Sequence, residues 1–283
     1  MIQSKEQSKK INEDYIIKRC HDLLQSTGIT EPPVDPKILA SFCGINKIAE
    51  EDIEEAGMLI PIKKDDFKIL LRKHDSKKRK RFSCCHEICH TFMPDFELKP
   101  QKRVDKETGY YGKDNNIEYL CDFGASELLM PSFLFNDKFK QSGFSIKTLL
   151  ELSDEFVTSL EATAIKMVKM NPSKYALVIW DQTHKPSEME LVTGQTLPGF
   201  ESGRPKKKLR VKMGFGFGGK HIPTHKSLVE DNNIVFDAYS NNVKKKGKGS
   251  INFGYFSVNC TIHALPMTSI DRVLTLLEKK KIV

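Results

Sequence analysis

The sequence predicts an α+β protein with a mainly helical N-terminal core that carries a small sheet, then a helical pair, then a C-terminal mixed α/β domain. Two observations predict this class. Helical hydrophobic spacing dominates the first 170 residues, and from Lys174 onward the pattern changes to short strand-like runs separated by turn residues. A length of 283 residues accommodates two or three domains of ordinary size. We expect the domains to span residues 1–140, 141–172 and 173–283.

In the N-terminal core, hydrophobic periodicity and turn residues predict two helices, three strands and then a third helix. Asp35 is the expected N-cap of the second helix and Pro36 its first residue, a common helix start. After the third helix, which ends at Pro94, we expect a polar loop over Leu98–Asn115. The expected elements are a helix over Lys5–Gln25, a helix from Pro36 to Gly44, strands over Ile45–Ile48, Ala56–Ile62 and Phe67–Arg72, and the helix before Pro94.

That third helix contains the stretch RFSCCHEICHTFMP, in which His86, Glu87 and His90 form an H-E-x-x-H motif. Residues at positions i and i+4 lie on one helix face, so both imidazoles can reach one metal ion. The carboxylate of Glu87 can then take a proton from a water molecule activated by that metal, which suits hydrolysis. The alternative interpretation is an amphipathic helix with two partly buried histidines.

A second helix, predicted over Asn116–Pro131, supplies a candidate third ligand. Glu118 and Asp122 share one face of this helix at i, i+4 spacing. A carboxylate from a following helix commonly completes a His, His, Glu zinc site with an open position. Glu118 is therefore the candidate ligand, and Asp122 the candidate acceptor of a ligand histidine's ring N–H. Taken alone, the same residues also fit an exposed acidic stripe.

Together these motifs resemble the ImmA/IrrE family of metallopeptidases in order and spacing. The similar segments are Val34-Asp35-Pro36 with Leu39-Ala40 and Gly44-Ile45, then RFSCCHEICH, then E-x-x-C-D-x-x-A-S-E-L-L-M-P from Glu118 to Pro131. The family's corresponding helix reads E-x-x-A-N-x-F-A-x-x-L-L-M-P. The resemblance implies a zincin-like core in which His86, His90 and Glu118 bind Zn²⁺, or Mn²⁺ or Fe²⁺, and Glu87 is the general base.

The chain departs from the family pattern at three positions. Cys89 replaces the glycine usual in H-E-L-G-H, Asp122 stands where asparagine is common, and Gly124 stands where phenylalanine is common. None of these changes removes a ligand. The thiols of Cys84, Cys85 and Cys89 can in principle ligate or compete for metal or sense oxidation, but buried reduced side chains are the favoured interpretation.

The segment Ser145–Met170 predicts two short helices around a turn at Leu152–Phe156, with helix-turn-helix-like spacing and the second helix starting near Thr158. A DNA-reading helix carries Arg, Lys, Asn or Gln near its start, whereas this one begins TSLEA. We therefore expect a structural helical pair.

The C-terminal third is expected to be β-rich and to close with a helix over Asp271–Lys280; by the family resemblance it is compatible with a GAF-like sensory domain. Gly214, Gly216 and Gly219 form a G-x-G-x-x-G, but no helix is expected after it, so we interpret it as a glycine-rich turn. The lysine-rich stretches 206–212 and 244–248 are expected to be exposed loops. The expected strands are Tyr175–Trp180, Glu190–Thr193, Leu209–Met213, Asn233–Tyr239 and Ile251–His263.

The composition of the chain favours a cytoplasmic protein over a membrane or secreted one. No apolar run approaches the roughly 20 residues of a membrane span, and the first residues show no secretory signal. Seven cysteines, an odd number, argue against a disulfide framework and for a reducing cytoplasm. The net charge of +8 could favour nucleic acid or an acidic partner, but short lysine runs carry most of it.

The leading hypothesis is a cytoplasmic metal-dependent endopeptidase. By the resemblance, its substrate is a helix-turn-helix transcriptional repressor, cut to derepress stress or mobile-element genes. The first alternative is a regulator that binds DNA or a repressor partner without proteolysis, based on the charge and the helical pair. The second is an interaction module that keeps a purely structural zinc site, against which the intact Glu87 argues.

Overall fold

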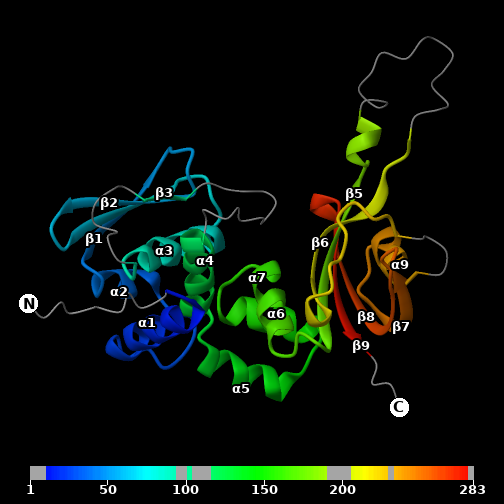
Figure 1. Cartoon of the computed structure of the whole chain (residues 1–283), viewed down its shortest axis with the longest axis horizontal. Helices are drawn as coiled ribbons and strands as arrows, with labels where there is room; N and C mark the ends of the chain where they lie inside the picture. The colour runs from blue at the N-terminus through cyan, green and yellow to red at the C-terminus, as the bar shows by residue number, and fades with distance from the viewer. Residues whose placement is uncertain (1–10, 94–100, 104–115, 190–204, 229–232, 280–283) are drawn as a thin grey trace, which may run out of the picture. The chain divides into compact units, whose positions relative to one another are not determined.

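The computed structural model shows an α+β protein and describes residues 11–93, 101–103, 116–189, 205–228 and 233–279 (Figure 1). The chain divides into two compact units. The first comprises residues 1–141 with 152–159, and the second comprises residues 142–151 with 160–283. The prediction of a mixed α+β class is therefore confirmed. Within the described residues, no helix is long and apolar enough to cross a membrane.

The N-terminal unit contains a four-stranded sheet in the order β1-β3-β2-β4. Strands β1 and β3 are parallel, whereas β2 pairs antiparallel with β3 on one side and β4 on the other. The three predicted strands are confirmed. The prediction of a loop over Leu98–Asn115 is wrong at Gln101–Arg103, which form strand β4. These three residues have no hydrophobic pattern of their own and become a strand because they pair with β2. The strands are β1 (Ile45–Glu51), β2 (Gly57–Lys63), β3 (Asp66–Arg72) and β4 (Gln101–Arg103).

The described part of this unit contains five helices, of which four were predicted from the sequence. Asp35 caps α2 by accepting a hydrogen bond from the backbone N–H of Lys37 at 2.9 Å. Helix α5 follows the L-L-M-P ending directly, and its buried Phe135 and Phe139 have the i, i+4 spacing that could have revealed it. The helices are α1 (Glu13–Ser26), α2 (Pro36–Ser41), α3 (Lys77–His90), α4 (Asn116–Leu129) and α5 (Ser132–Ser142).

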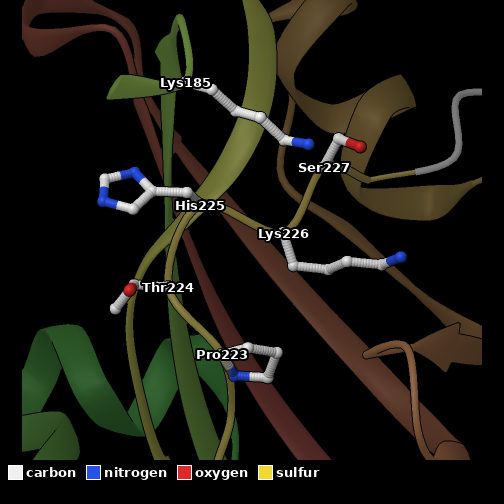
Figure 2. A pocket seen from close by; sticks show the side chains of 6 residues that line it. All are labelled: Lys185, Pro223, Thr224, His225, Lys226 and Ser227. Carbon is white, nitrogen blue, oxygen red and sulfur yellow. The ribbon is translucent and has the colours of Figure 1, made fainter. Parts of the chain in front are cut away.

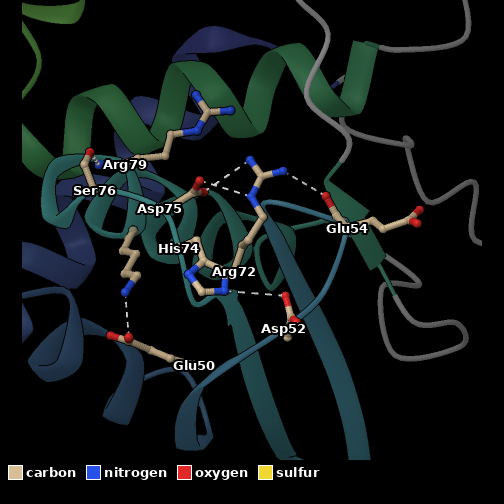
Figure 3. Close-up of polar contacts among 9 residues, drawn as sticks. Glu50, Asp52, Glu54, Arg72, His74, Asp75, Ser76 and Arg79 are labelled. Carbon is tan, nitrogen blue, oxygen red and sulfur yellow. Dashed lines mark hydrogen bonds and ion pairs between the residues drawn. The ribbon is translucent and has the colours of Figure 1, made fainter.

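Helix α3 carries the H-E-x-x-H motif and is tied to the sheet at its start. Ser76 caps it by accepting a hydrogen bond from the backbone N–H of Arg79. Just before the helix, the Arg72 guanidinium donates to both carboxylate oxygens of Asp75, at 3.0 and 3.4 Å, and to the carbonyl of Glu54 at 2.9 Å (Figure 3). The helix ends at His90, four residues earlier than Pro94, which lies outside the described residues.

The predicted helical pair is present as α6 (Ile146–Glu155) and α7 (Leu160–Lys169). The turn lies at residues 156–159, so α7 starts two residues later than Thr158. Val157 adopts a left-handed conformation within this turn, with φ of 53°.

The C-terminal unit is built on a five-stranded antiparallel sheet in the order β6-β5-β9-β8-β7. Helix α9 (Ile234–Asn241) packs against β7, β8 and β9. The core of this unit includes Trp180, Phe253 and Val235, which are almost completely buried. The strands are β5 (Tyr175–Thr183), β6 (Lys208–Gly216), β7 (Lys245–Asn252), β8 (Ser257–Met267) and β9 (Arg272–Lys279); the short 3-10 helices are η2 (Pro186–Glu188), η4 (Phe217–Gly219) and η5 (Thr268–Ile270).

Two elements of this unit have the opposite type to that predicted. The expected strand Asn233–Tyr239 is helix α9, in which Asn233 caps the helix by accepting from the backbone N–H of Val235. The expected closing helix Asp271–Lys280 is strand β9. Because β9 lies between β5 and β8, its residues 273–277 are all buried, and a strand buried on both faces loses the alternation that distinguishes it from a helix.

The expected continuous strand Ile251–His263 is instead a hairpin of β7 and β8. Its turn includes Gly254 at φ 104°, and the backbone N–H of Phe253 donates to the carbonyl of Phe256. The lysine-rich stretches are only partly loops, because β7 begins at Lys245 and β6 at Lys208. An edge strand tolerates lysines because one side faces solvent. The expected strand Glu190–Thr193 lies outside the described residues.

Candidate metal site

Helices α3 and α4 pack closely and bring the predicted site residues together. His86, Glu87 and His90 are buried, with exposed fractions of 1%, 0% and 1%. The Glu118 carboxylate of α4 lies beside both imidazoles. One of its oxygens is 3.2 Å from His86 Nε2 and the other is 3.5 Å from His90 Nε2. Two ring nitrogens and a carboxylate therefore converge from two helices.

Asp122 lies one helical turn after Glu118 and contacts the other nitrogen of His86. Its carboxylate oxygen is 2.8 Å from His86 Nδ1, the distance of a good hydrogen bond. When Nδ1–H donates to Asp122, Nε2 keeps its lone pair and faces Glu118. The structure therefore places Asp122 beside the ring nitrogen of His86 that faces away from Glu118.

Cys121 is a contact that the sequence reasoning missed. Its Sγ lies 3.6 Å from His90 Nδ1, and Cys121 is fully buried. Nitrogen or sulfur atoms of His86, His90 and Cys121 also lie within 4.8 Å of one another, which makes them a possible ligand set in their own right. The signal was available in the chain, because Cys121 lies three residues after Glu118 and therefore on a neighbouring part of the same helix face.

The pKa values of these groups reflect a site rich in carboxylates. Burial by itself lowers the pKa of His86, but hydrogen bonds with Asp122 and Glu118 outweigh burial and raise it above its usual value. Burial, followed by repulsion from His86, lowers the pKa of His90 to about 4. Burial opposes ionisation of Glu118, yet its hydrogen bond and its charge interactions with the two histidines hold its pKa below the ordinary value. The carboxylates outnumber the imidazoles here, which favours a bound cation.

The carboxylate of Glu87 lies against the backbone of strand β2. A Cβ atom at Gly57 would stand only 2.7 Å from Glu87 Oε1 and 3.3 Å from its carboxylate carbon. A side chain at position 57 would therefore displace the Glu87 carboxylate. Gly57 is thus a second residue beside the candidate site that no sequence motif marks.

Cys89 of α3 and Gly124 of α4 lie against each other. A Cβ atom at Gly124 would lie 2.6 Å from Cys89 Sγ and 2.9 Å from Ile16 Cγ2. The sulfur of Cys89 thus occupies space between α3 and α4 that a side chain at position 124 would need. A larger residue on one helix is accommodated by a smaller residue on the other.

All seven cysteines are free, and those near the motif are buried. Burial raises the pKa of Cys84 to about 12 and holds the pKa values of Cys85 and Cys89 well above the ordinary value. A thiol with a raised pKa is a poor nucleophile and oxidises slowly. These side chains accordingly have the character of packing residues, as the sequence favoured.

The donor set fits a divalent metal ion. Imidazole nitrogens and a carboxylate are ligands that Zn²⁺ and related metals accept. The separations of 3.2 and 3.5 Å between donor atoms are close to those of ligands that share one ion at about 2.0–2.2 Å. The same donors would also suit Mn²⁺ or Fe²⁺, so this geometry does not select the metal.

Two hollows elsewhere lack this combination of groups. One, of about 240 Å³ in the C-terminal unit, is lined by Lys185, Pro223, Thr224, His225, Lys226 and Ser227, with Lys185 pointing toward Ser227 and His225 extending the opposite way (Figure 2). The other, of about 350 Å³ in the N-terminal unit, is lined by His21, Leu24, Gln25, Gly28, Ile29, Thr30 and Phe133. Neither lining contains a carboxylate that could serve as a general base.

One protein family matches the middle of the chain, from β2 to α7. Residues 60–167 match the IrrE N-terminal-like domain family, Peptidase_M78. Over these residues the predicted resemblance to the ImmA/IrrE family is confirmed. The match includes the H-E-x-x-H motif, Glu118 and the L-L-M-P ending.

Among solved structures, the chain is similar to a transcriptional regulator of Mycobacterium tuberculosis. The two are 10% identical, with a TM-score of 0.51 over 94% of this chain and 79% of the other. At this identity the similarity concerns the fold. No curated protein matches the sequence significantly.

Proposed function

We propose that this protein is a metal-dependent endopeptidase whose site is formed by His86, His90, Glu118 and Glu87. The observation that carries the proposal is the convergence of both Nε2 atoms and the Glu118 carboxylate next to a buried glutamate. The family of the matched domain supports a peptidase, and its zincin-like core is part of the same proposal.

In this proposal each residue has a defined task. His86, His90 and Glu118 hold the metal, and Asp122 keeps the proton of His86 on Nδ1. A metal ion held by these residues would supply Lewis acidity, which polarises a carbonyl and lowers the pKa of water toward neutrality. Glu87 accepts the proton of that water and delivers it to the leaving amine. Burial of Glu87 next to Gly57 keeps its carboxylate in one position and away from bulk water.

We infer that the substrate is a protein, and specifically a helix-turn-helix transcriptional repressor in the cytoplasm. This rests on the family resemblance of the motifs and of the matched domain. We also propose that residues 173–283 form a regulatory domain of GAF-like type. An antiparallel sheet with a helix on one face supports this assignment. The corresponding boundaries are residues 1–140 for the peptidase core and 141–172 for the helical pair.

A second candidate function is binding of DNA or a repressor partner without proteolysis. Its supporting observation is the distribution of charge. The second compact unit has 21 lysines and arginines and 11 aspartates and glutamates, which gives it a net charge of +10. Since the whole chain has a net charge of +8, the first unit has a net charge of −2. A basic unit of this kind predicts salt-sensitive duplex binding that survives metal removal.

Metal content distinguishes the two functions. We expect close to one metal ion per wild-type chain and loss of that ion in Glu118→Ala and His90→Ala. His263→Ala, which changes a buried histidine of the C-terminal unit, is the matched control and should retain metal. Glu87→Gln should bind metal but fail to cleave a repressor. A folded wild-type protein that binds no metal, or a Glu87→Gln variant with full cleavage activity, would contradict the proposal.

A further inference from the structure

The two histidines of the site have different partners on their outer nitrogens. His86 Nδ1 faces the carboxylate of Asp122 at 2.8 Å, whereas His90 Nδ1 faces the sulfur of Cys121 at 3.6 Å. Both partners come from adjacent positions of α4, and both lie on the opposite side of an imidazole from Glu118. Each ligand histidine thus has its own polar contact from the same helix turn.

We propose that Cys121 is a positioning residue for His90, in which its sulfur accepts the Nδ1–H hydrogen bond and leaves Nε2 free for the metal. A neutral imidazole carries one proton, and the group next to one nitrogen decides which nitrogen keeps it. With the proton on Nδ1, His90 Nε2 presents its lone pair toward Glu118. This inference rests on the proposed metal site.

The geometry favours this role over direct ligation by the thiol. Nδ1 and Nε2 point to different sides of an imidazole ring, and Cys121 contacts the Nδ1 side. Glu118, in contrast, is near the Nε2 atoms of both histidines. An ion held by both Nε2 atoms and Glu118 is therefore on the other side of the His90 ring from the sulfur.

The two outer contacts also differ in strength, because one acceptor is a carboxylate and the other is a thiol sulfur. A thiol sulfur is a weaker acceptor than the carboxylate that faces His86. Loss of the Cys121 contact should consequently cost less metal affinity than loss of the Asp122 contact.

The test measures Zn²⁺ affinity by competition with a chelating dye for the full-length wild type, Cys121→Ala, Cys121→Ser and Asp122→Ala. Removal of an outer partner of a ligand histidine typically costs 10–100-fold in metal affinity. We expect a loss of about tenfold for Cys121→Ala and a larger loss for Asp122→Ala. Cys121→Ser keeps an acceptor and should recover part of the affinity. Cys20→Ala, a buried thiol of α1 that contacts the carbonyl of Gly124, is the matched control and should leave affinity unchanged.

Two spectroscopic measurements separate positioning from other roles. With Co²⁺ bound, a positioning sulfur produces no thiolate-to-metal charge-transfer absorption. With diamagnetic Zn²⁺ bound, the nitrogen resonances of His90 should report a protonated Nδ1. A charge-transfer band that disappears in Cys121→Ala would overturn the inference by making Cys121 a ligand. Unchanged Zn²⁺ affinity in Cys121→Ala would also overturn it while leaving the metal site intact. Absence of metal from the wild type would instead refute the proposed function itself, and this inference with it.

Discussion

Substitution of Gly124 by alanine tests whether the α3–α4 contact is as tightly packed as the structure indicates. The Cβ atom of an alanine at position 124 would lie 2.6 Å from Cys89 Sγ, far closer than two such atoms approach in a folded core. Both neighbours, Cys89 and Ile16, are completely buried and have no solvent to move into. The added methyl group must therefore push the helices apart or force a side chain out of its preferred rotamer.

Two opposing effects set the magnitude. Replacing glycine by alanine inside a helix stabilises it by about 1 kcal/mol. Overpacking a well-packed core costs about 1–3 kcal/mol. Because the new methyl group makes two close contacts, we expect the cost of overpacking to exceed the gain in helix propensity. Gly124→Ala should therefore lower the free energy of unfolding by about 1–2 kcal/mol.

A double-mutant cycle identifies the responsible contact. In a Cys89→Ala background the sulfur is absent, and Gly124→Ala should be less destabilising by about 1 kcal/mol or more, with Ile16 still limiting the recovery. In a Cys260→Ala background the cost should be unchanged, because Cys260 is a buried cysteine of β8 in the C-terminal unit.

Urea unfolding of metal-free protein is the assay. Far-UV circular dichroism reports both units, whereas the single tryptophan, Trp180, lies in the C-terminal unit. The change should appear in circular dichroism and leave the Trp180 transition in place. If Gly124→Ala proves more stable than wild type, as helix propensity alone predicts, the close-packing argument is wrong.

Three further predictions follow from the same structure. Gly57→Ala should reduce peptide cleavage about tenfold or more with metal content unchanged, because it displaces the Glu87 carboxylate; equal cleavage rates would show that Glu87 has room to move. Burial lowers the pKa of His263 below its ordinary 6.5, so the unfolded chain binds the proton more readily and the C-terminal unit should lose stability as pH falls through about 6.5. The Trp180 transition measures this loss, which His263→Gln should reduce. Chelator should lower the melting temperature of the wild type but not of Glu118→Ala, and an equal shift in both would place the metal elsewhere.

The helices that carry the candidate site were largely predictable. An H-E-x-x-H on a helix specifies which side chains share a face, and the i, i+4 pair of Glu118 and Asp122 follows from the same periodicity. Asp35 and Asn233 each cap the start of a helix, but the sequence analysis placed Asn233 in a strand. Patterns within one helical turn therefore predicted α3 and α4, although α5 was missed and α9 was predicted as a strand.

Errors occurred where strand pairing overrides local pattern. Strand β9 is buried on both faces in the middle of a sheet, so its continuous apolar run resembles a helix. Strand β4 exists because β2 offers an unpaired edge to residues without a strand-like pattern. In both cases the determining partner is distant in sequence.

Sequence by itself determined the helical spacing of His86 and His90, the identity of the general-base candidate and the carboxylates available to complete the site. Only the tertiary structure decided which atoms meet. Contact between α3 and α4 puts Glu118 beside both imidazoles and Cys121 beside His90 Nδ1, and the approach of β2 puts Gly57 against Glu87. Periodicity defines a face of one helix, whereas the register and distance between elements depend on how side chains of both surfaces interlock.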